Sequence, residues 1–168
     1  MILVGITGAS GVPIAYKLLE KLKEKGKKTE LIISKAGETV LNVESNYSKD
    51  NLAELADKSF DIQDLTAAPA SGSHKFDAMV IVPCSMKTLA SIAHGYADNL
   101  ITRAADVCLK EKRKLILVVR ESPLNVIHLE NMLKLAKLGV IIAPPVPSFY
   151  IKPDNIENII DYLVGRIF

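Results

Sequence analysis

Short, continuous apolar runs alternate along this chain with longer segments whose apolar residues recur at helical spacing. The first run is 2–6, and after a glycine-containing loop Leu18, Leu19 and Leu22 recur among Lys and Glu residues. Continuous apolar runs are typical of parallel strands that are covered on both faces. Strands that alternate with helices through short connections favour a doubly wound arrangement.

We therefore predict an α/β fold: a Rossmann-like doubly wound parallel sheet in a three-layer αβα sandwich, forming a single domain over 1–168, with strand order 3-2-1-4-5-6. Pro83 is expected to stop the fourth strand, and Asp154 to cap the final helix with Glu157 at capping-box spacing. The predicted strands cover 2–6, 29–33, 60–65 (a short edge strand), 78–82, 115–119 and 140–143.

Composition excludes several classes of protein. Hydrophobic residues make up 49% of the 168 residues and charged residues 24%, which excludes intrinsic disorder. The net charge is +2 and there is no Trp, so we expect no nucleic-acid partner. No apolar run approaches the roughly 18 residues of a membrane helix, and the N-terminus lacks a signal peptide's basic region. We therefore expect a cytoplasmic protein with no membrane partner, with Cys84 and Cys108 as buried free thiols.

Ligands of such sheets bind beyond the carboxyl ends of the strands. The loops expected there carry small residues, hydroxyls and one Arg-Glu pair; they are 7–11, 34–35, 83–85, 120–122 and 144–150. The spacing of Gly5, Gly8 and Gly11 lets backbone amides approach a phosphate at a helix N-terminus. The dinucleotide fingerprint is absent, because its first spacing would be one residue shorter and Ser34 replaces the expected acid. A mononucleotide such as FMN fits better.

Other candidate residues have two interpretations. Ser85 and Thr88 cap a helix, face a flavin or phosphate, or do both. Arg120 can bind phosphate bidentately and Glu121 can act as an acid or base, although an exposed ion pair would be ordinary. The charged run 110–114 is typical of a solvated helix end. The three histidines lack metal-ligand spacing, so no metal site is expected.

Seven segments together resemble the flavin prenyltransferases of the UbiX type, in order and nearly end to end: 5–11, 33–36, 69–73, 82–89, 99–106, 119–123 and 128–133. The resemblance implies a flavoprotein that joins a dimethylallyl group from dimethylallyl phosphate to N5 and C6 of reduced FMN. The product, prenylated FMN, is the cofactor of UbiD-type decarboxylases. Members of this family act without a metal and assemble as homododecamers, with sites between subunits.

The resemblance also implies residue roles. FMN would be held by Gly8, Ala9, Ser10, Ser34, Ser85, Met86, Lys87, Thr88 and Arg120. The prenyl phosphate would be bound by Lys110, Arg120, Tyr150, Arg166 and Arg103, and Glu121, Ser10 and Glu44 would lie at the chemistry. Lys110 thereby leaves the solvated run and points inward. Cations would stabilise the phosphate released when the allylic C–O bond breaks, and Glu121 or the phosphate would move the protons.

Two departures and two alternatives accompany this interpretation. Glu121 is followed by Ser-Pro-Leu instead of the more common Ala-Pro-Phe. In many members an aromatic tail covers the site, and here Phe149, Tyr150 or a neighbouring subunit would take over that role.

An FMN-dependent cysteine decarboxylase of the same fold would need an early His and a Pro-Ala-Ser-Ala-Asn loop, whereas no His precedes His74 and the loop reads Pro-Ala-Ser-Gly-Ser. The other alternative is a non-catalytic flavin carrier or accessory subunit of a decarboxylase, against which Glu121, Lys110 and Tyr150 argue.

Overall fold

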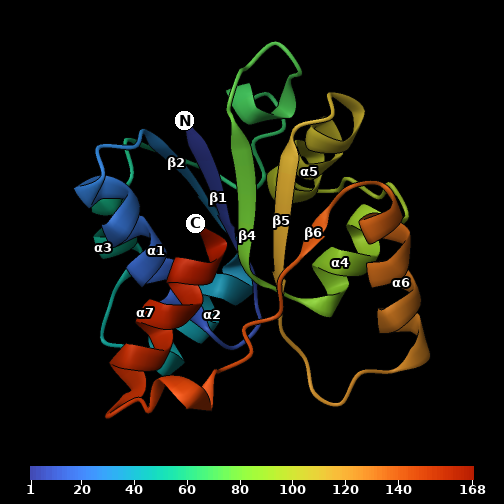
Figure 1. Cartoon of the computed structure of the whole chain (residues 1–168). Coiled ribbons are helices and arrows are strands. Elements are labelled where there is room, and N and C mark those ends of the chain that lie inside the picture. The colour runs from blue at the N-terminus through green and yellow to red at the C-terminus, as the bar shows by residue number, and fades with distance from the viewer.

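The computed structural model describes residues 1–168 and contains one parallel sheet of six strands (Figure 1). The order is β3-β2-β1-β4-β5-β6, as predicted. The strands are β1 (Ile2–Ile6), β2 (Thr29–Ile33), β3 (Lys58–Phe60), β4 (Ala78–Cys84), β5 (Lys114–Val119) and β6 (Ile141–Ile142). Because the chain builds outward from β1 on one side and then returns to β4 on the other, a crevice is expected outside the carboxyl ends of these two strands.

Seven α-helices cover the two faces of the sheet (Figure 1). One face carries α1 (Val12–Glu24), α2 (Lys35–Glu44), α3 (Lys49–Leu55) and α7 (Ile156–Ile167). The other carries α4 (Met86–Ala93), α5 (Leu100–Lys110) and α6 (Val126–Lys137). Two single turns of 3₁₀ helix, η1 (Ala68–Ala70) and η2 (Phe149–Ile151), complete the structure.

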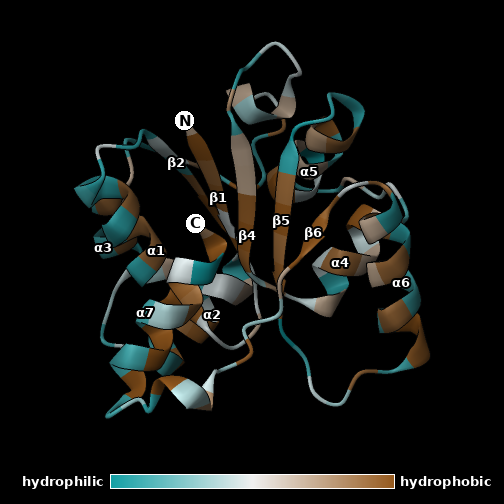
Figure 2. Cartoon of the chain, viewed as in Figure 1, coloured by the Kyte–Doolittle hydropathy of each residue, from teal (hydrophilic) through white to brown (hydrophobic).

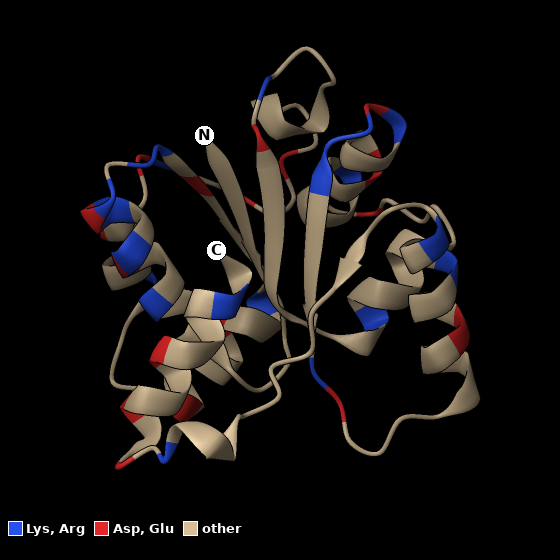
Figure 3. Cartoon of the chain, viewed as in Figure 1, with Lys and Arg blue, Asp and Glu red and all other residues tan.

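Alternate residues of each strand face opposite helical layers. Met79 and Leu117 belong to a cluster of 20 buried residues under α4 and α5, while Val80 and Ile116 belong to one of 18 under α1 and α7. Because both faces are buried to a similar extent, the central strands are largely apolar, and Figure 2 shows most of β1 and β5 as hydrophobic. Figure 3 shows the charged residues mainly on helices and loops around a largely uncharged sheet.

The third and fourth strands differ most from the prediction, while β5 begins one residue earlier and β6 is one residue shorter at each end than expected. The third strand covers Lys58–Phe60 instead of 60–65. It ends at Phe60 because the Asp61 and Asp64 carboxylates accept hydrogen bonds from the backbone two residues ahead and turn the chain away. The fourth strand continues through Pro83 to Cys84, because the Pro83 carbonyl still accepts hydrogen bonds from the loop after β1 even though proline has no N–H.

The predicted cap of the last helix is also wrong by one residue. Asn155, not Asp154, is the N-cap, and its side-chain oxygen accepts a hydrogen bond from the Asn158 amide at 3.0 Å. The Asp154 amide instead donates to the Asn158 side chain. Both cysteines are free and buried. None of the helices combines the length and the apolar composition that crossing a bilayer requires.

Candidate functional site

A cavity of about 480 Å³ lies beyond the carboxyl ends of β1, β2 and β4. This size is typical of small-molecule sites. It is lined by Thr7, Gly8, Ser34, Lys35, Ala36, Ile62, Gln63, Ser85, Lys87, Thr88, Asp98, Asn99 and Ile101. The structure thus brings together five of the nine residues assigned to FMN from the sequence: Gly8, Ser34, Ser85, Lys87 and Thr88.

Three helices begin at this cavity. Ser34 caps α2 by accepting from the Gly37 amide at 3.0 Å, Ser85 caps α4, and Asn99 caps α5. The unpaired amides and positive dipole ends of three helices therefore converge on one cavity, and Lys35 and Lys87 add positive charge. Such an arrangement suits a phosphate group. Asn99 is not among the site residues predicted from the sequence, although its spacing to Thr102 is that of a reciprocal cap.

Thr7 fixes the floor of the cavity. Its side chain is 3% exposed, its hydroxyl donates to the Pro83 carbonyl at 2.8 Å, and the same oxygen accepts from the Ser85 amide at 2.8 Å. A single hydroxyl therefore ties the loop after β1 to the end of β4. Gly8 follows directly and lies against the first turn of α2, where a Cβ would overlap the Cβ of Ala36. Thr7 was also missed, because a lone threonine in a glycine loop carries no distinctive signal.

Glu44 lies at the other end of the glycine loop. From the last turn of α2, its carboxylate accepts hydrogen bonds from the amides of Gly11 and Val12 at 2.8 and 3.1 Å. Gly11 precedes α1 and has no side chain with which to cap it, so Glu44 supplies the cap. This contact fixes the loop that carries Ala9 and Ser10, which lie between the cavity and the start of α1.

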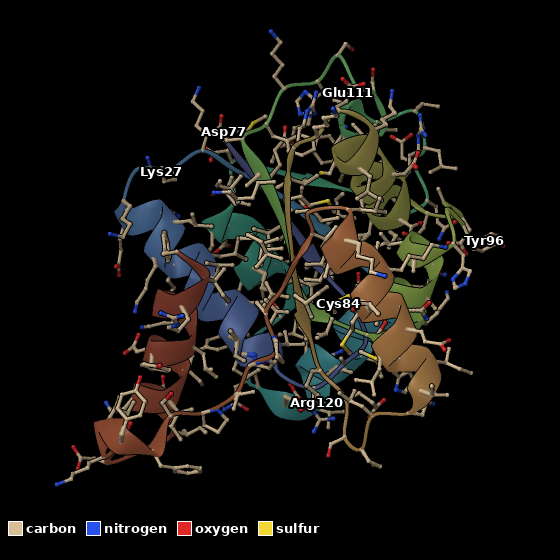
Figure 4. All side chains as sticks on the ribbon, turned by 45° about the vertical axis from the view of Figure 1, so that its right-hand side comes forward. Lys27, Asp77, Cys84, Tyr96, Glu111 and Arg120 are labelled. Atoms are coloured by element: carbon tan, nitrogen blue, oxygen red, sulfur yellow. The ribbon has the colours of Figure 1, made fainter.

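Arg120 and Glu121 follow β5 at the same edge of the sheet, and both are exposed. Figure 4 shows Arg120 at the lower edge, at the opposite end of the molecule from Glu111. The Glu121 carboxylate accepts a hydrogen bond from the next amide at 2.9 Å and forms no ion pair. Neither residue lines the cavity within one chain, nor does Met86, the first residue of α4.

Lys110 and Arg103 lie along α5, which leads away from the cavity. Lys110 ends this helix, eleven residues after Asn99, a separation of about 16 Å at 1.5 Å per residue. The Arg103 Nε donates to the Ala70 carbonyl at 3.1 Å, and its guanidinium pairs with Asp106. Within one chain, these two cations therefore lie beside the 69–73 loop and not at the cavity.

Tyr150 and Arg166 form a third group. The Tyr150 hydroxyl is 2.7 Å from that of Tyr162, and hydrogen bonds from Ser148 and then Tyr150 lower the pKa of Tyr162. Arg166, in the last turn of α7, lines a separate cavity of about 300 Å³ together with Tyr162 and Pro144. Phe149 and Tyr150, the aromatic residues considered as covers for the site, are about three-quarters exposed.

A doubly wound sheet with a phosphate-suited cavity at its carboxyl edge is the framework of a flavin-binding protein, and the profile of the Flavoprotein family matches residues 1–168. Within it, the chain belongs to the flavin prenyltransferases, which are transferases. It is 51% identical over 166 residues to flavin prenyltransferase UbiX of Methanocaldococcus jannaschii, covering 99% of this chain and 90% of that protein. It is 50% identical over 166 residues to the mitochondrial flavin prenyltransferase PAD1 of Saccharomyces cerevisiae, covering 99% of this chain and 69% of that protein.

Solved structures of UbiX-type proteins also closely resemble this chain. A dodecameric FMN-dependent UbiX-like decarboxylase from Escherichia coli O157:H7 superposes with a TM-score of 0.97 at 48% identity, covering 99% of this chain and 91% of that one. AnUbiX (PadA1) in complex with FMN and dimethylallyl pyrophosphate superposes with a TM-score of 0.98 at 48% identity, covering 99% and 88%. The peptidyl-cysteine decarboxylase EpiD, with a TM-score of 0.68 at 20% identity, shares the fold alone.

Proposed function

We propose that this protein transfers a dimethylallyl group from dimethylallyl phosphate to N5 and C6 of reduced FMN, and that a UbiD-type decarboxylase receives the prenylated FMN. The observation that carries this proposal is the cavity on which three helix N-termini converge, because it suits the phosphate of a mononucleotide. The family of the chain and the FMN and dimethylallyl pyrophosphate bound by AnUbiX support the two substrates.

In this proposal, the cavity-lining residues hold FMN together with Ala9, Ser10, Met86 and Arg120. Ser34, Ser85 and Thr88 present hydroxyls and first-turn amides, and Lys87 adds a positive charge. Reduced FMN supplies the nucleophilic N5 and C6 atoms when bound. Glu44 keeps the loop of Ser10 in place through its two hydrogen bonds to the start of α1, and so positions Ser10 near the chemistry.

The prenyl phosphate needs cations that one chain does not bring to the cavity. Lys110 lies about 16 Å along α5 from Asn99, and the Arg103 side chain binds the Ala70 carbonyl, so we assign both cations to the site of a neighbouring subunit. Arg120, Tyr150 and Arg166 complete the binding of this phosphate. A homododecamer with sites between subunits would bring these groups together, and the dodecameric assembly of the E. coli relative supports it.

The chemistry follows from these charges. Breaking the allylic C–O bond leaves an allylic cation and inorganic phosphate, and Lys110, Arg120 and Arg166 would stabilise the negative charge as it develops. Glu121 or the released phosphate would accept the proton that leaves C6. Burial between subunits would exclude water from the allylic cation. A cytoplasmic location is part of the same proposal, since two free buried cysteines fit a reducing compartment.

The test is anaerobic incubation with reduced FMN and dimethylallyl phosphate, followed by mass spectrometry of the flavin, with dimethylallyl diphosphate as a second donor in a parallel arm. We expect a flavin heavier by C5H8. Recovery of unmodified FMN alone from both arms would contradict the proposal and favour the flavin-carrier alternative.

Glu121→Gln should slow this conversion by about 100-fold while FMN stays bound, the usual scale of general acid–base catalysis. The matched control is Glu130→Gln on α6, which removes the same charge from an exposed residue without an ion pair. Normal turnover in Glu121→Gln would remove Glu121 from its proposed role.

A further inference from the structure

Arg113 belongs to the charged run that the sequence predicted to be solvated, but its guanidinium binds the protein itself. One terminal nitrogen donates to the His74 carbonyl at 2.7 Å and the other to the Gly72 carbonyl at 2.5 Å. The same guanidinium lies 4.8 Å from the ring centroid of Phe76. A planar fork that holds two carbonyls and stacks on a ring is a geometry that Arg provides and Lys does not.

The loop held by Arg113 lies directly against Lys110. A Cβ added to Gly72 would stand 2.5 Å from Glu111 Oε1 and 3.2 Å from Lys110 Nζ, so the backbone of Gly72 occupies the space beside this ion pair. The pair itself is formed at 3.0 Å and is about half exposed. The Lys110 ammonium and the Glu111 carboxylate, at the C-terminal end of α5, therefore both lie beside this loop.

Other contacts hold the two ends of the loop. Arg103 donates to the Ala70 carbonyl at 3.1 Å, before Gly72. After Gly72, the His74 ring is 2.8 Å from Glu30, a carboxylate of β2 that is only 6% exposed. Arg113 is the side chain from outside the loop that binds the segment between these anchors, where the loop meets Lys110.

We propose that Arg113 is a positioning residue for prenyl transfer: it fixes the 72–74 backbone against the Lys110–Glu111 pair and so sets where the Lys110 ammonium meets the donor phosphate. This inference rests on the proposed function, in which Lys110 serves a neighbouring subunit's site. Arg113 touches neither substrate in this proposal. Arg113 should therefore affect the binding of the donor and not that of FMN, because the FMN cavity is built from other loops.

Two variants and one control test this role in the assembled enzyme. Arg113→Lys keeps the charge but removes the fork, and Gly72→Ala places a methyl group where Lys110 and Glu111 now stand. Lys75→Gln is the control, because it removes a positive charge from the same loop at an exposed residue without an ion pair. Steady-state kinetics with dimethylallyl phosphate would give KM and kcat, and flavin titration would give the Kd of FMN.

We expect Arg113→Lys to raise the KM for dimethylallyl phosphate about tenfold, the scale of losing hydrogen bonds made by a charged group. Gly72→Ala should raise this KM to a similar extent, because its methyl group displaces Lys110 and Glu111. The Kd of FMN should stay within about twofold of the wild type, and Lys75→Gln should resemble the wild type in both quantities. A merely structural role would lower the melting temperature without changing KM.

Three results would overturn the inference. An unchanged KM in both variants removes the positioning role while leaving the proposed function intact, as long as the wild type forms prenylated FMN. A KM that rises more in Lys75→Gln than in Arg113→Lys would assign the effect to long-range charge. A wild type that forms no prenylated FMN overturns the proposed function and this inference together. If Arg113→Lys does not assemble, the KM of Gly72→Ala for dimethylallyl phosphate decides whether the positioning role holds.

Discussion

Gly8 gives the sharpest test of how the cavity is built. A Cβ at this position would overlap the Cβ of Ala36 and lie 3.3 Å from the Ala36 carbonyl carbon, closer than nearly all real contacts of a Cβ. Gly8 is not among the glycines with positive φ, so alanine can adopt its backbone conformation and the whole penalty is steric. Because Gly8 and Ala36 both line the cavity, relief of the overlap must move one of its walls.

The magnitude follows from the size of the overlap. Inserting a methyl group where the neighbour is itself near backbone typically costs about 1–3 kcal/mol. We therefore expect Gly8→Ala to lower the free energy of unfolding by this amount. We also expect it to weaken FMN binding at least tenfold, which is about 1.4 kcal/mol.

A second substitution identifies the cause. Ala36→Gly removes the overlapping methyl group, at a cost of up to about 1 kcal/mol in the first turn of α2. FMN affinity of the double variant Gly8→Ala/Ala36→Gly should lie within about threefold of Ala36→Gly alone, a large non-additive coupling. Quenching of flavin fluorescence gives the affinities, and urea unfolding gives the stabilities. Wild-type affinity in Gly8→Ala, or an equal loss with and without Ala36→Gly, would refute this account of the cavity.

Three other properties can be measured directly. Glu44→Ala removes the acceptor for two amides at the start of α1 and should cost about 1–2 kcal/mol in urea unfolding; a cost below about 0.5 kcal/mol would contradict the capping role. Burial raises the pKa of Cys84 and raises that of Cys108 to about 12, so a thiol reagent at pH 8 should label neither thiol until the protein unfolds, and labelling of the folded protein would contradict their burial. A hydrogen bond from Lys21 lowers the pKa of the Asp161 carboxyl, so its stabilisation is present above about pH 4 and is lost as pH falls below that. Because Asp161 is 44% exposed, its pairing is worth less than about 1 kcal/mol, and Asp161→Asn should flatten the acid limb of the stability curve slightly; an unchanged acid limb would count against the pairing.

The order of the strands and the edge that carries the cavity could be predicted from the sequence, because both depend on short-range patterns. An apolar run such as 115–119 specifies a strand buried on both faces, and a glycine loop after the first strand specifies the turn into a helix. The errors occur where side chains compete locally with the backbone. Asp61 and Asp64 end the edge strand early. Asn155 caps the last helix in place of Asp154, and because both residue types are favoured as N-caps, residue type alone does not distinguish them.

The residues of the candidate site also differ in whether their contacts are local or distant in the sequence. Ser34 and Ser85 could be found because a cap is defined by its own helix, so its place follows from its place in the chain. Arg113 could not, because its partners are carbonyls about 40 residues away, and a carbonyl has no signature in a sequence. Lys110 is the intermediate case: the resemblance to the family assigns it a role, but only the course of α5 reveals that it lies away from its own chain's cavity. In the proposed function, such a residue acts where a second chain presents its cavity to it, so the proposed assembly of the subunits would complete the active site.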